Sequence, residues 1–108
     1  MRPEAEAIMS AKWSLPVLRV LLDGPTRFSV IRNKIDGITA NLLAARLKEL
    51  EKRGVLVKDY LPEPANRAVY RLTEKGKAVR EIVEALDRWS EQWANDPHPH
   101  DAEGGSAR

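Results

Sequence analysis

The chain contains no cysteine, and this single absence excludes several kinds of chemistry. A disulfide framework, a thiol switch, a cysteine nucleophile and a thiolate zinc site all need that residue. There is also no glycine-rich phosphate loop and no nucleophile motif. Both histidines, His98 and His100, lie near the C-terminus, so the region expected to fold offers no histidine general base. We expect neither enzymatic activity nor a bound cofactor.

These two histidines invite a second interpretation as a metal site, because Asp96 and Asp101 stand beside them. A protein metal site needs a third well-placed ligand and groups that orient the ligands. The surrounding segment supplies neither. We therefore expect no bound metal.

Long apolar runs are absent as well. No stretch approaches the ~20 residues needed to cross a bilayer, and residues 1–10 have neither the basic region nor the apolar core of a signal peptide. We expect a cytoplasmic protein without a membrane partner. At 108 residues, with 31% charged and 43% hydrophobic residues, the composition is that of one globular domain. We assign this domain to residues 1–93 and expect a disordered tail over residues 94–108.

Neither sign of charge predominates, since the formal net charge is only +2. That value does not identify a nucleic-acid partner, so the distribution matters more than the sum. Residues 39–72 contain seven basic side chains against four acidic ones, whereas three acidic side chains face one basic side chain from residue 94 onward. Positive charge is therefore concentrated in one part of the folded region.

Apolar residues at helical spacing predict two helices in the first third of the chain. The first spans residues 14–23, with Ser14 as its N-cap, Pro16 in its first turn and Gly24-Pro25 as its stop. Residues before Ser14 are expected to form a separate short helix. The second helix is marked by apolar residues spaced three and four apart: Phe28, Ile31 and Ile35.

A third helix is predicted over residues 39–53, with Thr39 as its N-cap. Its apolar line, which is expected to face inward, consists of Leu43, Leu47 and Leu50. The opposite face carries short side chains first and lysines later: Asn41, Ala44, Ala45, Lys48 and Lys52. Small residues permit close approach to a groove, and lysines suit phosphates. Taken alone, the same face is also compatible with an ordinary solvated helix surface.

Two strand-like runs follow the third helix, over residues 55–61 and 67–72, around the Pro-rich segment 62–66. Two helices followed by a third and a hairpin are the order of a winged helix-turn-helix, so the fold class is mainly α with a small β-hairpin. In that fold, we expect the third helix to enter the major groove of double-stranded DNA. The residues assigned to that groove are Thr39, Asn41, Ala44, Ala45 and Lys48. The residues assigned to the backbone or the minor groove are Lys52, Lys58 and Arg67, although the charge of Lys58 is equally explained as protection of an exposed strand edge.

The last helix is predicted to begin at Thr73-Glu74 and to carry an apolar stripe. Its members are Val79, Ile82, Leu86, Trp89 and Trp93. Two tryptophans are costly to expose, and a two-fold symmetric reader of DNA needs a dimer interface, so we assign the stripe to a homodimer. Ile8 and Met9 are expected to pack against the partner's last helix, and Trp13 belongs to the core. Two alternatives remain: the stripe covers its own domain, or it docks a different protein and makes the fold a protein-interaction module.

Several motifs together resemble the HxlR family of winged-helix transcriptional regulators. They are Lys12-Trp13-Ser14-Leu15, Leu18 to Pro25, Arg27-Phe28-Ser29, Gly37-Ile38-Thr39, Leu42-Leu43, Arg46 to Glu51, Gly54 to Val57 and Tyr70 to Gly76. The resemblance covers about residues 8 to 93. It implies a homodimeric bacterial or archaeal regulator that binds operator DNA through the third helix and the wing, with N- and C-terminal dimerisation helices.

This chain departs from the family pattern in three places. It lacks the N-terminal cysteine through which many members sense oxidants or electrophiles, so thiol sensing is excluded. Its wing tip, residues 62–66, is about one residue shorter than usual, and Pro16 stands where relatives usually carry an aliphatic residue. A small-molecule effector would fit in a cavity between the helices and the dimer interface, but no residue pattern identifies one.

Overall fold

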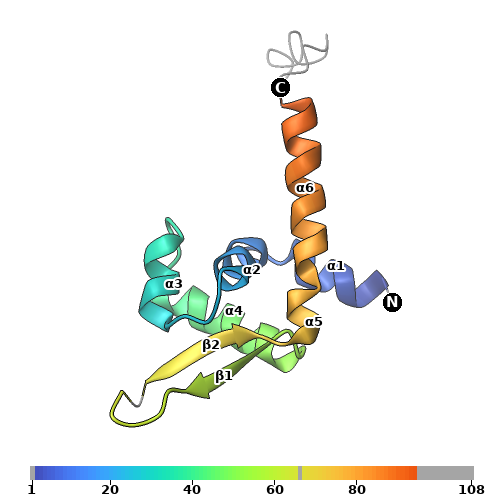
Figure 1. Cartoon of the computed structure of the whole chain (residues 1–108). Coiled ribbons are helices and arrows are strands. Elements are labelled where there is room, and N and C mark those ends of the chain that lie inside the picture. The colour runs from blue at the N-terminus through green and yellow to red at the C-terminus, as the bar shows by residue number, and fades with distance from the viewer. Residues whose placement is uncertain (1, 66, 95–108) are drawn as a thin grey trace.

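The computed structural model describes residues 2–65 and 67–94. The elements in chain order are α1 (Arg2–Ser10), α2 (Ser14–Leu22), α3 (Phe28–Lys34), α4 (Ala40–Lys52), β1 (Leu56–Tyr60), β2 (Ala68–Leu72), α5 (Glu74–Lys77) and α6 (Val79–Trp93). Figure 1 shows α2, α3 and α4 above the hairpin. Helix α6 rises on the side of the domain away from α3. The predicted fold class, mainly helical with one β-hairpin, is confirmed. No helix within the described residues is long and apolar enough to cross a membrane.

The core lies between α2, α3, α4 and the base of the hairpin. Its side chains come from apolar positions spaced three and four residues apart, which place them on one face of each helix. The residues with the least exposed surface include Val17, Leu18, Ile31, Leu43, Leu47, Leu50 and Leu56. The predicted inward line of the third helix is therefore confirmed. Trp13 is partly buried and packs against this cluster.

The start of α2 differs from the prediction. Ser14 is not the N-cap, because Trp13 occupies that position with a left-handed φ of 76°. The reason is the preceding turn, in which the Ser14 amide donates to the carbonyl oxygen of Ala11 over 3.1 Å and carries Ser14 into the helix. Its side chain is buried, and its hydroxyl has no hydrogen-bond partner among the described residues. The separate short helix expected before this point is present as α1.

Helix α4 begins and ends as its sequence predicts. The Thr39 side-chain oxygen accepts a hydrogen bond from the Leu42 amide over 3.1 Å, which satisfies one of the free amides of the first turn. Gly54 follows the helix with φ of 77°, a left-handed conformation that glycine adopts without steric cost. These two signals fix the length of the helix and hence which side chains it presents.

The hairpin pairs β1 with β2 in antiparallel register, from Leu56 opposite Leu72 to Tyr60 opposite Ala68. The observed strands lie within one residue of the predicted ones, and the Leu61 amide extends the ladder to the carbonyl oxygen of Arg67. On its other edge, β2 forms an isolated bridge with Thr26. The hairpin is therefore anchored to the connection between α2 and α3.

The last helix is divided in two, whereas a single helix was predicted from Thr73. Helix α5 ends at Lys77, and Ala78 joins it to α6 with ψ of −16°. Thr73 does cap the first piece, because its side-chain oxygen accepts a hydrogen bond from the Gly76 amide. Just before the interruption, Gly76 lies close to the backbone of Val55, and this contact holds α5 against the hairpin.

Candidate nucleic-acid interface

The face of α4 opposite the core is open to solvent. Every residue that the sequence assigned to the major groove or to phosphates on this helix is exposed: Thr39, Asn41, Ala44, Ala45, Lys48 and Lys52. Because Leu43, Leu47 and Leu50 are buried on the other side, the rotation of the helix is fixed. The structure thus brings the assigned α4 residues together on one accessible surface, which we call the α4 face.

The charge balance around α4 leaves its lysines available. The carboxylate of Glu49 accepts a hydrogen bond from Arg53 Nε over 2.8 Å, so its charge is balanced within the helix. Neither Lys48 nor Lys52 forms an ion pair with another described residue. Glu51 is the remaining acidic side chain on the helix. The α4 face consequently presents two cations with no ion-pair partner among the described residues toward its C-terminal end, where they suit phosphate oxygens.

Leu42 is a residue that the sequence interpretation left out of the site. It follows Asn41 on the first turn of α4, and 46% of its surface is exposed. An exposed leucine beside the exposed Asn41 amide has the chemistry for apolar contact with a thymine methyl group. The sequence could have indicated this exposure, because Leu42 is adjacent to Leu43 and so lies outside the line of buried leucines.

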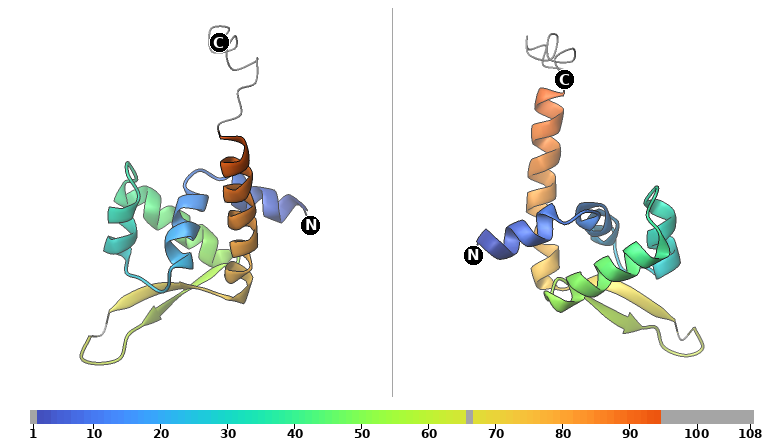
Figure 2. Two further views of the ribbon diagram at one scale, coloured as in Figure 1. Left: turned by 45° about the horizontal axis from the view of Figure 1, so that its top comes forward. Right: turned by 180° about the vertical axis from the view of Figure 1, so that it is seen from behind.

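The hairpin extends from the domain beside α4, as the views in Figure 2 show. Lys58 and Arg67 are both exposed on it. The Lys58 ammonium lies 6.0 Å from the ring centre of Tyr60 and 5.9 Å from that of Tyr70, which are cation–π distances. Lys58 is thus held over the sheet, whereas Arg67 stands at the start of the returning strand.

Other charged residues of the hairpin are balanced locally. Asp59 accepts a hydrogen bond from Arg71 across the two strands, so this carboxylate adds little repulsion toward DNA. Tyr60, with 66% of its surface exposed, is a second residue that the sequence interpretation overlooked. The sequence could have indicated this, because side chains alternate between the two faces of a strand. Tyr60 is two residues after Lys58 on β1, so the two side chains share a face.

The residues assigned to the dimer interface divide into two groups. Ile8 and Val79 are each only 7% exposed, because they belong to the core of their own chain. Met9 is partly buried. The remaining members stand on α6 with large exposed fractions: Ile82 at 42%, Leu86 at 42%, Trp89 at 65% and Trp93 at 48%. We call these four the α6 face.

No group of three potential metal ligands occurs within residues 2–65 and 67–94. His98 and His100 lie outside the described residues. So does the tail predicted over residues 94–108, apart from Ala94.

Comparison with known proteins places this arrangement in a family. The family model described as HxlR-like helix-turn-helix matches residues 8–98. This chain is a member of the HxlR-like helix-turn-helix family. As a member it is a DNA-binding transcriptional regulator, and the resemblance found in the sequence is confirmed.

HxlR-like relatives are similar to this chain both in sequence and in structure. The HTH-type transcriptional regulator YodB of Bacillus subtilis is 36% identical over 89 residues, covering 82% of this chain and 80% of YodB. An uncharacterised HTH-type regulator of Methanothermobacter thermautotrophicus is 40% identical over 87 residues, covering 81% of this chain and 66% of that protein. The structure of reduced YodB superposes with a TM-score of 0.78 at 34% identity, over 89% of this chain and 93% of that chain.

Proposed function

We propose that this HxlR-like chain acts as a homodimer that reads an inverted-repeat operator, with α4 in the major groove of each half-site and the hairpin against the flanking backbone. The observation that carries the proposal is the exposed α4 face, with its short side chains first and its unpaired lysines last. A recognition helix needs this order, because its N-terminal residues reach base edges while its later residues meet phosphates.

Different roles follow from the chemistry of each side chain. The amide of Asn41 can both accept from and donate to adenine, and Ala44 and Ala45 allow the helix to approach the bases closely. Thr39 retains a hydroxyl hydrogen for a contact in the major groove while its oxygen caps the helix. Lys48 follows these residues on the α4 face and is assigned to the major groove with them. Lys52, Lys58 and Arg67 neutralise backbone phosphates, and Arg67 stands closest to the wing tip in sequence.

The homodimer is supported by the α6 face. Four large apolar side chains on one helix, two of them tryptophans, form a surface that a second copy can cover. Two-fold symmetry would pair this face with itself, and an inverted repeat requires a reader with that symmetry. Since Ile8 and Val79 are already buried within their own chain, the proposed contact rests on α6 and Met9.

A small-molecule effector could occupy a cavity beside the proposed dimer contact. A cavity of about 200 Å³ lies between α1 and the start of α6, lined mainly by apolar side chains that include Ile8, Met9 and Val79. One structure of the relative YodB contains bound quinone. This chain has no cysteine thiol to react with such a molecule.

The surface that binds DNA can be tested before any operator is known. Non-specific phosphate binding uses the same basic surface at low salt, so a generic duplex added to isotope-labelled protein should shift the amide resonances of α4 and the hairpin. Removing Lys48 and Lys52 together should weaken this binding strongly. Removing Lys12 and Lys77, two exposed lysines elsewhere, subtracts the same charge and should have a much smaller effect. Equal weakening by both pairs, or shifts confined to α6, would contradict the proposed interface.

A further inference from the structure

The buried contacts that helix α6 makes with its own domain lie near the beginning of the helix. Val79 and Val83 are buried in the core, and the Arg80 guanidinium donates a hydrogen bond to the carbonyl oxygen of Leu22 over 2.8 Å. Every residue from 84 to 94 is exposed. The distal part of α6 therefore extends beyond the domain, as Figure 1 shows.

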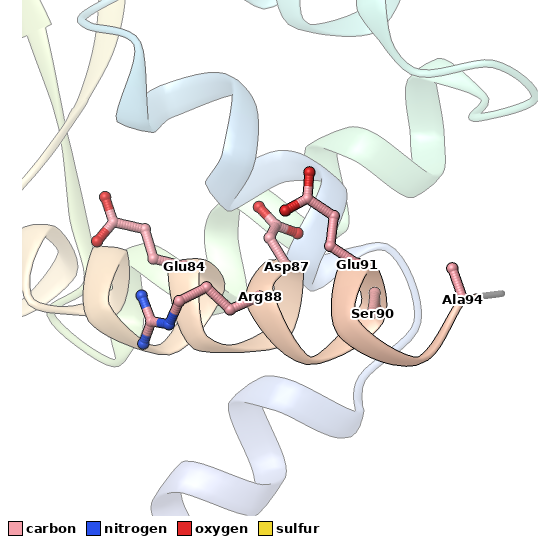
Figure 3. A pocket seen from close by; sticks show the side chains of 6 residues that line it. All are labelled: Glu84, Asp87, Arg88, Ser90, Glu91 and Ala94. Carbon is pink, nitrogen blue, oxygen red and sulfur yellow. The ribbon is translucent and has the colours of Figure 1, made fainter. Parts of the chain in front are cut away.

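One ion pair extends this attachment by a helical turn. The two terminal nitrogens of Arg19, on α2, donate to the two carboxylate oxygens of Asp87 over 3.1 Å and 2.8 Å. Asp87 lies four residues after Val83 and so falls on the same side of α6. In Figure 3 its side chain stands between those of Glu84 and Glu91. Among the side-chain hydrogen bonds of the described residues, this pair ties down the most distal position of α6.

We propose that the Arg19–Asp87 pair fixes the direction of α6 relative to α4 and thereby sets the half-site spacing that the dimer reads. This inference rests on the proposed homodimer, in which the α6 face joins the two copies. A bidentate guanidinium–carboxylate pair suits such a role, because its two parallel hydrogen bonds favour one relative orientation. Arg19 and Asp87 are thus positioning residues and do not themselves touch DNA.

The size of the effect follows from helix geometry. The ten residues after Val83 form an arm of about 15 Å at ~1.5 Å per residue. A change of about 10° in its direction moves the end of the arm by about 2.6 Å, and two-fold symmetry applies the change to both copies. Adjacent base pairs are separated by about 3.4 Å. A small freedom of α6 is therefore comparable with one base pair of operator spacing.

The test uses the full chain and the operator duplex that it enriches from a pool of randomised DNA. Two further duplexes have one base pair more or one fewer between the two half-sites. The unaltered dimer should prefer one spacing. Arg19→Ala and Asp87→Ala should each reduce that preference about two- to fivefold, the range expected for one surface ion pair. The double exchange Arg19→Asp with Asp87→Arg should restore it. Glu91→Ala is the matched control, because Glu91 lies one turn farther along α6 and forms no ion pair with a described residue.

Each outcome has a distinct meaning. If the unaltered chain is monomeric or binds no preferred repeat, the proposed function fails and the inference fails with it. If the variants dimerise and keep the original spacing preference, the homodimer stands but the positioning role is overturned. An equal loss of affinity for all three spacings also overturns it, because a merely stabilising contact would act in that way.

A second measurement does not depend on DNA binding. Since the chain has no cysteine, Lys34→Cys introduces one labelling site per copy, at the exposed end of α3 and outside the α6 face. Spin labels there report the distance between the two domains of a dimer. The distribution should broaden in Arg19→Ala and return to its original width in the charge-exchanged protein. An unchanged width in Arg19→Ala would overturn the inference.

Discussion

Gly76 lies directly against the backbone of Val55. A Cβ atom at position 76 would come within 2.1 Å of the Val55 carbonyl oxygen and 3.0 Å of the Leu72 side chain. The same oxygen accepts a hydrogen bond from the Thr73 amide over 3.0 Å, so it is held in place. This contact joins α5 to the base of the hairpin, and only glycine fits it.

Gly76→Ala should therefore force α5 away from the hairpin. We expect the free energy of unfolding to fall by about 1–3 kcal/mol, the range for overpacking of a tight site. Denaturant unfolding measures the change, with Lys77→Ala as the control because that neighbour is exposed. Equal stability of the two variants would show that the contact can relax without cost.

Thr39 combines a capping role with a position on the α4 face, and two substitutions separate these roles. Thr39→Ala removes the bond to the Leu42 amide and should cost about 1 kcal/mol of stability. Thr39→Asp keeps a capping oxygen but adds negative charge, so the protein should stay stable while DNA affinity falls. Thermal unfolding and DNA titration of both variants provide the test. Unchanged DNA affinity in the aspartate variant would remove this residue from the interface.

Truncation of Asn41 and truncation of Lys48 should change DNA binding in different ways. Asn41→Ala should relax the preference at one base position at a cost of about 1–3 kcal/mol. Lys48→Ala should weaken all sequences similarly and reduce the slope of affinity against salt concentration by about one phosphate contact. Titration of matched and mismatched duplexes at several salt concentrations distinguishes the two. If neither variant alters binding, α4 does not contact the DNA.

Trp89 is the most exposed member of the α6 face, at 65%. Trp89→Glu should place a charge in the proposed dimer contact and yield monomers, without reducing the helical content. Light scattering gives the molecular mass, and circular dichroism confirms folding. Glu91→Gln serves as a control on the same helix. Retention of a dimer by the Trp89 variant would mean that another surface joins the copies.

The Arg19–Asp87 pair also predicts a response to acid. The hydrogen bond from Arg19 lowers the pKa of the Asp87 carboxyl from its ordinary value of 3.8. A lowered pKa means that the pair stabilises the folded state above that ordinary value, and that the contribution is lost as the pH falls through the lowered one. The stability difference between the chain and Asp87→Asn should be constant near neutral pH and should disappear in strong acid. Denaturant unfolding across this pH range measures it, and a difference that persists in strong acid would argue against the pair.

Local sequence signals predicted much of the fold. Thr39 and Gly54 mark the ends of α4, and the spacing of its buried leucines fixes the face that it exposes. These features depend on residues within one or two helical turns, so they can be inferred without knowledge of the tertiary structure. The exposure of the α4 face follows from the same pattern.

Other features depend on packing between distant segments and could not be predicted in this way. The left-handed conformation of Trp13 carries Ser14 into α2. The last helix is interrupted at Ala78, and Gly76 just before it packs against Val55. Arg19 and Asp87 are 68 positions apart in the chain, and nothing in their local sequence indicates that they meet. Their pairing is visible only once α2 and α6 are placed side by side.

The central claim is that a homodimer reads an inverted repeat through α4 and the wing. Selection of the purified protein against randomised duplexes at near-physiological salt tests it most directly, because weak phosphate binding is then suppressed. The expected result is enrichment of an inverted repeat whose half-sites lie about one helical turn apart, bound by a dimer. A well-folded protein that enriches no sequence would contradict the claim and would favour a protein-interaction module.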